Sequence, residues 1–392
     1  MWSSQVHPSN VNNAYRLNCN SSGNANINNN NRSYAFSVRG VFQLYSFFEM
    51  KLTKKQLYND LYKAYIDAKK HISNKPDVVA FSKNLKQNLK ELCDEIYEGR
   101  YKQLPLICFI YAPNQSNRRE VFAARFRDKI VQHLLYNYVY VIFDKTFIYD
   151  SYSCRKNKGT LFGIKRFVHH SRSESNNYKE TCYALKLDIK GYFVHINRKL
   201  LFDIVINELN RLKPKYDDIL DFELIKYLCE VIILSDPTEN CIKLFTDEQI
   251  KKIPKRKLLF YSPKGYGLAI GNITSQLFSN IFLNLLDQYV KRILKAKHYG
   301  RYVDDVYIIS KDKEFLKKCI VDIAKFLKEN LDLELQMNKV QIKEIKYGVE
   351  FLGAYIKPYR IYVSNKTLRR IKKVMNETHN DIDANKKLLF LL

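Results

Sequence analysis

Apolar residues recur at helical spacing in several stretches of the chain. Leu57, Leu61 and Tyr65 lie one helical turn apart, and the same spacing continues over residues 81–96 until a glycine ends it. A third stretch follows a glycine-containing loop and runs through Val290. Side chains three or four positions apart share one face of a helix, so these stretches predict amphipathic helices that bury that face. They are expected to form core and are assigned no chemistry.

Two other stretches combine short, β-prone runs with acidic residues. Residues 301–309 (RYVDDVYII) place Asp304 and Asp305 between two such runs, which predicts a strand–turn–strand hairpin with both carboxylates at its tip. Residues 183–193 (YALKLDIKGYF) predict a short strand that ends at Asp188 and is followed by a glycine turn. Aspartate is common in turns, so the Asp-Asp pair alone is more simply explained as a polar turn. The second acidic strand end is the reason to consider a shared site.

Carboxylates at neighbouring strand ends are suited to binding divalent cations. Two such groups can hold two metal ions about 3.5–4 Å apart, one activating an attacking hydroxyl and the other steadying the leaving oxygen. Magnesium prefers oxygen ligands and keeps water and substrate phosphates in its shell. Without metal, clustered carboxylates repel and one takes a proton. The residues alone leave open whether Asp188 and Asp304 are neighbours.

The charge of the chain adds a partner to this picture. Its 392 residues include 66 Lys and Arg against 40 Asp and Glu, a formal net charge of +26. Such an excess repels itself in a compact fold and favours an anionic partner, with nucleic acid the first candidate and a membrane surface the second. No run approaches the roughly 18 apolar residues that span a bilayer, and no secretory leader is recognised, so no membrane partner is expected. The eight cysteines form no CxxC pair, which favours free thiols in a reducing cytoplasm.

The first 49 residues differ in composition from the rest. They contain no lysine and one acid, Glu49, and eleven of the first 32 residues are asparagine. A break of this kind marks a tail or a separate module, and the segment is too short for a core of its own. Residues 1–49 are therefore expected to be poorly ordered.

The order, spacing and residues of the two acidic motifs resemble those of the palm domain of reverse transcriptases, over about residues 110–360. The resemblance implies an α+β right-hand polymerase with fingers, a palm carrying an antiparallel sheet, and a short helical thumb. It implies RNA-directed DNA polymerase activity, a nucleotidyl transfer with two Mg²⁺ ions, on template RNA, cDNA or primer, and dNTPs. The implied divisions are 50–180 for N-terminal helices and fingers, 181–358 for the palm with a fingers insertion around 205–260, and 359–392 for the thumb.

Carried over residue by residue, the resemblance implies a metal site. Asp188 matches the family's first catalytic aspartate, and Asp304 and Asp305 match the pair in its Tyr-x-Asp-Asp box. Asp188 and Asp304 would ligate both ions, Asp305 would support them, and the Ile189 carbonyl would assist. Phe193, five residues after Asp188, falls at the steric gate that excludes ribonucleotides, although core packing explains a phenylalanine there equally well.

A second group of residues is implied to contact the incoming nucleotide. Arg119 aligns with the arginine that grips the triphosphate, for which a guanidinium offers paired donors. The lysine usual about six residues earlier is replaced by Pro113, and Arg118 is the candidate substitute. Lys339, after the alternating apolar run 331–337, falls where the family places a lysine near the triphosphate. A solvated hairpin for the arginines and an exposed strand end for the lysine are the simpler alternatives.

The block between the two acidic sites departs from most of the family. In residues 265–280 (GYGLAIGNITSQLFSN), Gly271 permits close backbone approach and Asn272 can cap the following helix. The family places this block against the templating base and the incoming nucleotide, which makes Ile270, Gly271 and Gln276 candidate contacts. Most members have Gln before this Gly and Ser-Pro later. The Ile-Gly-Asn-x-x-Ser-Gln wording here resembles the reverse transcriptases of diversity-generating retroelements. An aliphatic side chain removes a hydrogen-bond check on the nucleotide pair, so errors opposite adenine are expected.

Basic runs and a hairpin are the candidates for contact with the nucleic-acid strands. The Lys- and Arg-rich stretch 151–173 suits phosphate contact with a template, and a second basic run covers 251–257. Charge runs are often no more than solvated faces. Residues 351–355 (FLGAY) resemble the family's primer-grip hairpin, and the basic residues 369–373 are expected in a helical thumb. The predicted template and primer contacts are Arg155, Lys156, Lys158, Tyr302, Phe351, Leu352 and Gly353.

The N-terminal segment extends the resemblance to diversity-generating systems. Its Trp2-Ser-Ser start, Asn-rich middle and Phe-Ser-Val-Arg close at 36–39 look like the variable end of the target proteins in those systems. We hypothesise that residues 1–42 are a template repeat translated in frame, with Met50 the functional start. The predicted function is copying of template-repeat RNA into cDNA, error-prone at adenines, for targeted protein diversification (mutagenic retrohoming). The family also implies a small basic helical accessory protein that forms a ring, in a bacterial or phage-encoded cytoplasmic system.

Two alternatives stay open. A retron or abortive-infection reverse transcriptase would share the aspartates but not the Ile-Gly and Ser-Gln departures. A catalytically inactive RNA-binding scaffold on the same fold would not need all three aspartates. Primer extension with Mg²⁺ separates this scaffold from an enzyme.

Overall fold

The computed structural model of the 392-residue chain describes residues 13–19, 25–31, 51–112 and 118–378. The chain divides into two compact units, Met1–Glu49 and Met50–Leu392. In the first unit, strand β1 (Asn13–Cys19) pairs with β2 (Ala25–Asn31) in an antiparallel hairpin. The predicted poor order of residues 1–49 otherwise falls on residues outside the described ranges, as do Trp2 and residues 36–39.

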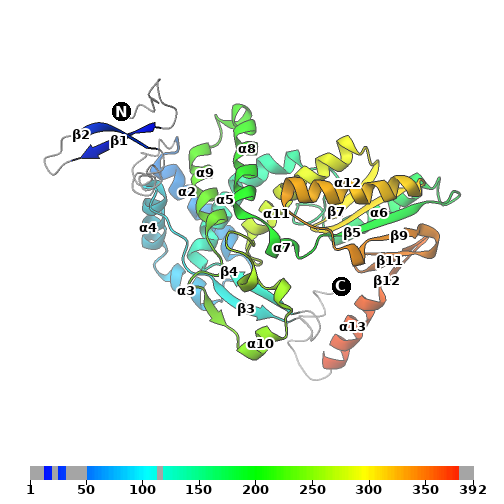
Figure 1. Ribbon diagram of the computed structural model, residues 1–392. Coiled ribbons are helices and arrows are strands. Elements are labelled where there is room, and N and C mark those ends of the chain that lie inside the picture. Colours follow the sequence, from blue (N-terminus) through cyan, green and yellow to red (C-terminus); the bar gives the residue numbers. More distant parts are fainter. Residues whose placement is uncertain (1–12, 20–24, 32–50, 113–117, 379–392) are drawn as a thin grey trace. The chain divides into compact units, whose positions relative to one another are not determined.

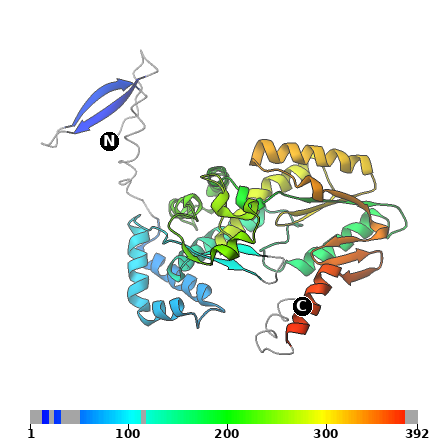
Figure 2. The same cartoon turned by 60° about the horizontal axis from the view of Figure 1, so that its bottom comes forward.

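Four helices form the first part of the second unit (Figure 1). Helices α2 (Lys54–Lys69), α3 (Pro76–Lys83) and α4 (Leu85–Tyr97) share a core with α5 (Phe126–Phe143). In Figures 1 and 2, the first three lie at the opposite end of this unit from its last strands and helix.

The helix predicted around Leu57 is confirmed as α2, and the apolar stripe of α2 is buried. The single helix predicted over residues 81–96 is instead two helices. Asn84 interrupts it with a non-helical backbone (φ −117°, ψ 41°). Asn88 Nδ2 then donates to the Phe81 carbonyl (2.9 Å), which satisfies an acceptor that the break leaves without a helical partner.

The central sheet of the second unit is antiparallel, with strand order β7–β8–β5–β9. Neighbouring side chains of a strand point to opposite faces, so each strand serves two cores. Val306 and Ile308 join the large core that contains α11 and α12, whereas Tyr307 and Ile309 join a second core with α6. All four side chains are buried, so the sheet is held on both faces. The bounds are β5 Tyr183–Asp188, β7 His298–Tyr302, β8 Asp305–Ser310, β9 Gln341–Glu344, α6 Thr160–Glu174, α11 Ile273–Gln288 and α12 Lys313–Leu331.

The alternating apolar run 331–337 does not form a strand. Helix α12 continues to Leu331 and ends at Asp332, whose φ is 52°. Leu335 makes only an isolated bridge, and a short 3₁₀ turn, Met337–Lys339, precedes β9. Leu331, Leu333 and Leu335 belong to the large core, from a helix end and a loop, whereas Met337 is exposed.

Two smaller sheets complete the second unit (Figure 1). β3 (Ile107–Tyr111) pairs antiparallel with β4 (Arg119–Ala123) and parallel with β6 (Ile242–Leu244). The sheet β10–β11–β12 is antiparallel and is followed by α13. The remaining bounds are α7 Tyr192–His195, α8 Arg198–Tyr216, α9 Phe222–Leu234, α10 Asp247–Lys251, β10 Val349–Phe351, β11 Ala354–Lys357, β12 Arg360–Val363 and α13 Asn365–Thr378.

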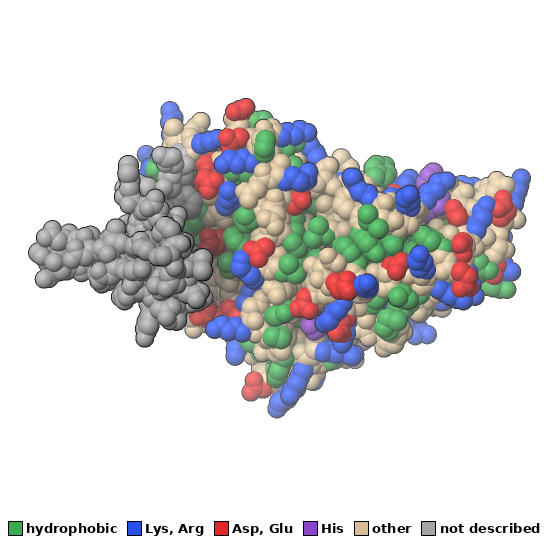
Figure 3. All heavy atoms as spheres, turned by 45° about the horizontal axis from the view of Figure 1, so that its top comes forward, with side chains coloured by type: hydrophobic (Ala, Val, Ile, Leu, Met, Phe, Trp, Pro, Cys, Tyr) green, Lys and Arg blue, Asp and Glu red, His purple; other side chains and the backbone are tan. Residues whose placement is uncertain are grey.

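Charge and hydropathy on the described surface are mixed. On the face in Figure 3, Lys and Arg side chains are interspersed with Asp and Glu across the second unit. Within the described ranges, no helix combines the length and the apolar character needed to cross a membrane.

Candidate active site

Sheet pairing brings the predicted carboxylates together. β5 ends at Asp188 and β8 begins at Asp305, and these two residues are direct partners in the antiparallel β5–β8 register. Side chains directly opposed in such a pair have Cβ atoms about 4.5–5.5 Å apart. Asp304 immediately precedes Asp305, in the turn between β7 and β8. The predicted hairpin is therefore confirmed, and three aspartates lie at one end of the sheet.

Crowding changes the titration of this cluster. Burial raises the pKa of Asp304 to about 6, and the neighbouring charges of Asp188 and Asp305 add to the rise. Burial also raises the pKa of Asp305, while the nearby Lys186 ammonium acts in the opposite direction. A cation placed between the carboxylates would relieve this repulsion.

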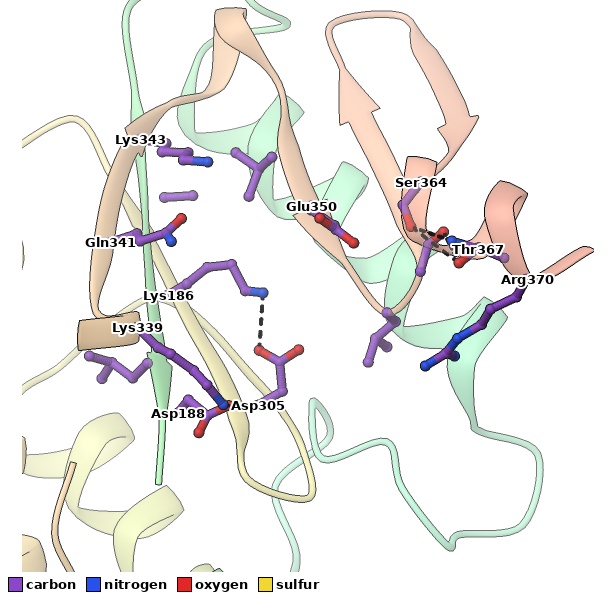
Figure 4. A pocket seen from close by; sticks show the side chains of 15 residues that line it. Lys186, Asp188, Asp305, Lys339, Gln341, Lys343, Glu350, Ser364, Thr367 and Arg370 are labelled. Carbon is purple, nitrogen blue, oxygen red and sulfur yellow. Dashed lines mark hydrogen bonds and ion pairs between the residues drawn. The ribbon is translucent and has the colours of Figure 1, made fainter. Parts of the chain in front are cut away.

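Two lysines approach the aspartates (Figure 4). Lys339 Nζ lies 2.9 Å from Asp188 Oδ2, and Lys186 Nζ lies 3.3 Å from Asp305 Oδ1. Sequence reasoning predicted Lys339 near the site but missed Lys186. The signal was available, because the two-residue period of a strand puts Lys186 on the same face of β5 as Asp188.

The residues present fit a magnesium site that substrate helps to complete. Among the described residues, no group of three or more His, Cys, Asp or Glu side chains is arranged to hold a metal ion unaided. Magnesium is usually bound through one or two carboxylates plus substrate phosphates. Asp188 and Asp304 can supply two carboxylates, although Asp188 is paired with Lys339 as Asp305 is with Lys186. The Ile189 carbonyl, predicted to assist, belongs to a residue whose side chain is buried in the large core.

A pocket of about 510 Å³ adjoins the aspartates and includes Asp188 and Asp305 in its wall. Its polar side chains come from β5, β8, β9, β10, the turn before β9, and the segment around α13 (Figure 4). The wall carries both acidic and basic side chains, and the basic ones suit contact with a phosphate-bearing strand. The basic residues that line it are Lys186, Lys339, Lys343 and Arg370.

The hairpin predicted at residues 351–355 is confirmed as the β10–β11 turn. Leu352 and Gly353 form the turn with positive φ (50° and 82°) and line the pocket. The predicted primer contact is wrong for the Phe351 side chain, because this side chain is 0% exposed and packs against two aromatic rings of the second core. Tyr302, the last residue of β7, is half-buried and packs against the same core.

Phe193 lies in α7, just after a glycine turn in the left-handed region (Gly191, φ 52°). Its ring is half-buried, with its centroid 5.2 Å from that of Tyr192. The Phe193 carbonyl accepts a hydrogen bond from Leu268 N (2.8 Å), which ties α7 to the loop before α11. The ring packs against the large core, as the core interpretation expects.

The loop before α11 is hydrogen-bonded to β4, and these contacts are called the clasp below. Phe122 N donates to the Ile270 carbonyl (2.9 Å). The buried Asn272 amide accepts from Ala124 N (3.0 Å) and donates to the Phe122 carbonyl (3.1 Å). Asn272 occupies the predicted N-cap position, but its side chain serves β4 and does not cap the helix. A Cβ at Gly271 would lie 2.7 Å from a β4 side chain, so this close approach requires glycine.

The clasp joins two regions that sequence reasoning connected with the nucleotide. Arg119 begins β4 and is exposed, and Arg118 before it is half-exposed. Ile270 is half-exposed and Gln276 is exposed in the first turn of α11. None of these four lines the pocket beside the aspartates. Pro113, which stands where the family usually has a lysine, lies outside the described residues.

The basic loop before α6 is used differently from the prediction. Arg155 Nε donates to Asp144 Oδ1 (2.7 Å), its other donors bind three backbone carbonyls, and its side chain is 7% exposed. Arg155 is therefore a structural residue, and the predicted template contact is wrong for this side chain. Lys156 is exposed. Burial lowers the pKa of Lys158 to about 8, and its ammonium lies 4.5 Å from the centre of the Tyr149 ring.

Comparison with known proteins gives a consistent family match. Residues 112–356 match the protein family described as "Reverse transcriptase (RNA-dependent DNA polymerase)". The "Putative COX1/OXI3 intron 2 protein" of Saccharomyces cerevisiae is 24% identical over 323 residues, which cover 72% of this chain and 36% of that protein. "Protein YkfC" of Escherichia coli is 23% identical over 304 residues, which cover 68% of this chain and 70% of that protein.

Solved structures of Candida tropicalis telomerase also align. The telomerase in complex with the TWJ fragment of telomeric RNA gives a TM-score of 0.45 at 10% identity, over 74% of this chain and 52% of that chain. The apo telomerase gives 0.45 at 13% identity, over 68% and 49%. The chain thus spans about a third of the yeast relative and about half of the telomerase chains.

Proposed function

The chain belongs to the reverse transcriptase (RNA-dependent DNA polymerase) family, and from that premise we propose that it copies RNA into DNA at the strand ends that carry Asp188, Asp304 and Asp305. The observation that carries this proposal is the direct pairing of Asp188 with Asp305 across β5 and β8, with Asp304 in the adjoining turn. This pairing joins Asp188 and the distant Asp304–Asp305 pair into one acidic site, which adjoins a pocket with lysine and arginine side chains in its wall.

The chain's own residues divide the work of the reaction. Two magnesium ions held by Asp188 and Asp304 would activate the primer hydroxyl and neutralise the leaving pyrophosphate. Lys186 holds the third carboxylate, Asp305, aside. Lys339, 2.9 Å from Asp188, stands where an ammonium can contact the triphosphate and donate a proton to its leaving oxygen.

Other residues select and orient the nucleotide. Arg119, with Arg118 beside it, would bind the triphosphate through paired guanidinium donors. Phe193 would exclude the 2′-hydroxyl of a ribonucleotide with its ring. Ile270 and Gln276 would contact the base pair being formed.

We assign the parts of a right-handed polymerase to the observed elements. The sheet β7–β8–β5–β9 is the palm, the turn between β10 and β11 is the primer grip, and α13 is a short thumb. The fingers combine the β3–β4 hairpin with an insertion around residues 205–260. The parallel pairing of β6 with β3 supports this assignment, because β6 comes from the insertion and β3 from the N-terminal part.

The more specific proposal is a diversity-generating reverse transcriptase that copies template-repeat RNA with errors at adenines. Its support is an aliphatic side chain, Ile270, in the loop that the family places against the nucleotide, and Ser275-Gln276 in place of Ser-Pro. The Asn-rich residues 1–42, as a translated template repeat, add to it. The proposed setting is a bacterial or phage-encoded cytoplasmic system.

The implied partner is a small basic protein ring. A chain with a formal charge of +26 would repel such a ring. The proposed contact is therefore one bridged by RNA or made through surface that is not basic.

Primer extension tests the general proposal. The full chain is given an RNA template, an annealed primer, dNTPs and Mg²⁺, and is compared with D304A, in which the rate should fall by about 10³-fold or more. D218A removes an exposed aspartate outside the site and serves as the matched control, with an unchanged rate. Extension by D304A at the wild-type rate would contradict the site, and a wild type that binds RNA without extending it would favour the inactive scaffold.

Sequencing of the products tests the subtype. I270Q restores an amide at the position and should lower misincorporation opposite adenine by about tenfold, with smaller changes opposite the other bases. I204Q places the same amide at a half-buried position on α8 and is the control. Wild-type products without an excess of errors at adenine would instead favour a retron or abortive-infection enzyme.

A further inference from the structure

The turn that carries Asp304 has a strained backbone. Tyr302 and Asp305 are partners in the β7–β8 register, which leaves Val303 and Asp304 as a two-residue turn. Val303 has a φ of 54°. Hairpin turns with positive φ at this first central position prefer glycine, and a β-branched residue there is an outlier. Strain of this kind persists only where the surroundings hold it.

A buried arginine contacts the turn from behind. Arg301 Nη1 donates to the Val303 carbonyl (3.1 Å), which belongs to the peptide group that also contains the Asp304 N–H. The Arg301 side chain is 0% exposed. The contact therefore fixes the peptide plane next to the backbone atoms from which the Asp304 carboxylate projects.

The remaining donors of Arg301 are fixed by α11 and the loop before α6. Nε and Nη2 bind the two carboxylate oxygens of Asp287 at 2.8 and 2.7 Å. Nη1 also donates to Asn280 Oδ1 (3.3 Å), and Nη2 also donates to Ser151 Oγ (3.3 Å). A guanidinium has five N–H donors, and these contacts use them all. Lysine has the same charge but cannot reproduce this planar fork.

We propose that Arg301 is a positioning residue for polymerisation. By holding the Val303 carbonyl, it keeps the strained turn in the conformation that presents the Asp304 carboxylate to divalent cations. Arg301 itself touches neither substrate nor cation in this scheme. The inference rests on the proposed polymerase function and adds the device that sets its metal-binding carboxylate.

A double-mutant rescue tests the inference. R301K keeps a positive charge opposite Asp287 but loses the fork, whereas V303G lets the turn adopt positive φ without strain. Binding of Mn²⁺ to the full chain is measured by the decrease of the EPR signal of the free ion. The affinity should be about tenfold lower in R301K than in the wild type. R301K/V303G should recover most of the affinity that R301K loses, because glycine removes the strain that Arg301 holds in the wild type.

A second buried arginine provides the matched control. Arg198 pairs with Asp236 and donates to the carbonyls of Tyr266 and Gly267. R198K should lower the melting temperature without changing the Mn²⁺ affinity. If R301K does not fold, N280A replaces it, because Asn280 Oδ1 orients the same Nη1 nitrogen; its weaker loss of affinity should also be rescued by V303G.

The outcomes separate this inference from the proposed function. Wild-type affinity in R301K, or a loss that V303G does not restore, would show that Arg301 serves stability alone and would overturn the inference. Wild-type primer extension is measured in parallel. If the wild type fails to extend, the proposed function is overturned; if it extends while R301K binds Mn²⁺ normally, only the inference is.

Discussion

Helix α11 holds two segments that contain candidate site residues, one at its N-terminus and one near its C-terminus, and the contacts that hold them differ. Near its C-terminus, Asp287 forms an ion pair with Arg301 in which both side chains are 0% exposed, and Arg301 in turn holds the Asp304 turn. At its N-terminus, Asn272 holds β4 through a neutral amide.

The difference follows from what each segment needs. The Asp304 turn contains a β-branched residue at positive φ, so a strong clamp is required to keep one conformation. β4 is a regular strand, so an amide that imitates a ladder partner is sufficient. A charged clamp in a dry interior is also less forgiving, because the loss of one partner leaves a buried charge unpaired.

The largest effect is expected from D287A. The substitution leaves the buried Arg301 guanidinium without its counter-ion and should lower the free energy of unfolding by about 3–5 kcal/mol. Chemical denaturation followed by circular dichroism measures this loss. D203A is the control, because Asp203 pairs with Lys199 on the surface (side chains 47% and 70% exposed) and should contribute less than about 1 kcal/mol. Equal losses in the two variants would mean that the buried pair is not the firmer clamp.

N272A should have the next largest effect. It leaves the Ala124 N–H and the Phe122 carbonyl without their side-chain partner, at a cost of about 2–3 kcal/mol. Because β4 begins with Arg119, the KM for dNTP should also rise while the KM for the template stays constant. N284A removes a half-exposed amide from the same helix and should change neither quantity appreciably. A dNTP KM that stays at the wild-type value would show that the clasp does not position the arginine.

Local pattern predicted one of these two clamped segments far better than the other. The Asp304 hairpin and the strand that ends at Asp188 were predictable because strand alternation and turn chemistry are properties of neighbouring residues. The amide contacts of Asn272 were not, because they join residues about 150 positions apart, and only the fold reveals that β4 takes the amide from the helix cap.

Charged and aromatic residues show the same limit of prediction from local sequence. Arg119 and Arg155 look alike in a basic sequence, yet one is exposed and the other is enclosed by carbonyls and Asp144. Phe351 lies in a recognisable hairpin, but the alternation within β10 turns its ring into the core. The role of a long side chain depends on burial, which is decided by distant parts of the chain.

The free energy of unfolding is expected to depend on pH through β4, the strand that the neutral Asn272 amide holds. Burial raises the pKa of Glu120 on β4 to about 7, although the Leu259 N–H donates to Oε2 and opposes the rise. The folded protein therefore holds a proton that the unfolded chain has lost, so stability should fall as the pH rises from about 4.5 to 7 and change little above that from this group. E120Q should flatten this slope and exceed the wild type by about 1–2 kcal/mol at pH 8.

Unfolding of wild type and E120Q at pH 5.5 and pH 8 measures this difference. E314Q, at an exposed glutamate on α12, is the control and should keep the wild-type slope. Parallel slopes in wild type and E120Q would mean that Glu120 is ionised in the folded protein, and β4 would then carry a buried charge after all.

The smallest effect separates close packing from backbone strain within the clasp. Gly271 (φ 118°) and Gly265 (φ 86°) both have backbones that disfavour alanine, but a Cβ at 271 would lie 2.7 Å from Val121 Cγ1 and 3.3 Å from the Phe122 carbonyl, whereas a Cβ at 265 meets nothing within 4 Å. G271A should therefore lose about 1 kcal/mol more than G265A in urea unfolding. Only G271A should also raise the KM for dNTP, because only that Cβ displaces β4. Equal losses and equal KM values would mean that β4 moves without an energetic cost. Contacts that let β4 move in this way could not fix the position of Arg119 relative to Ile270.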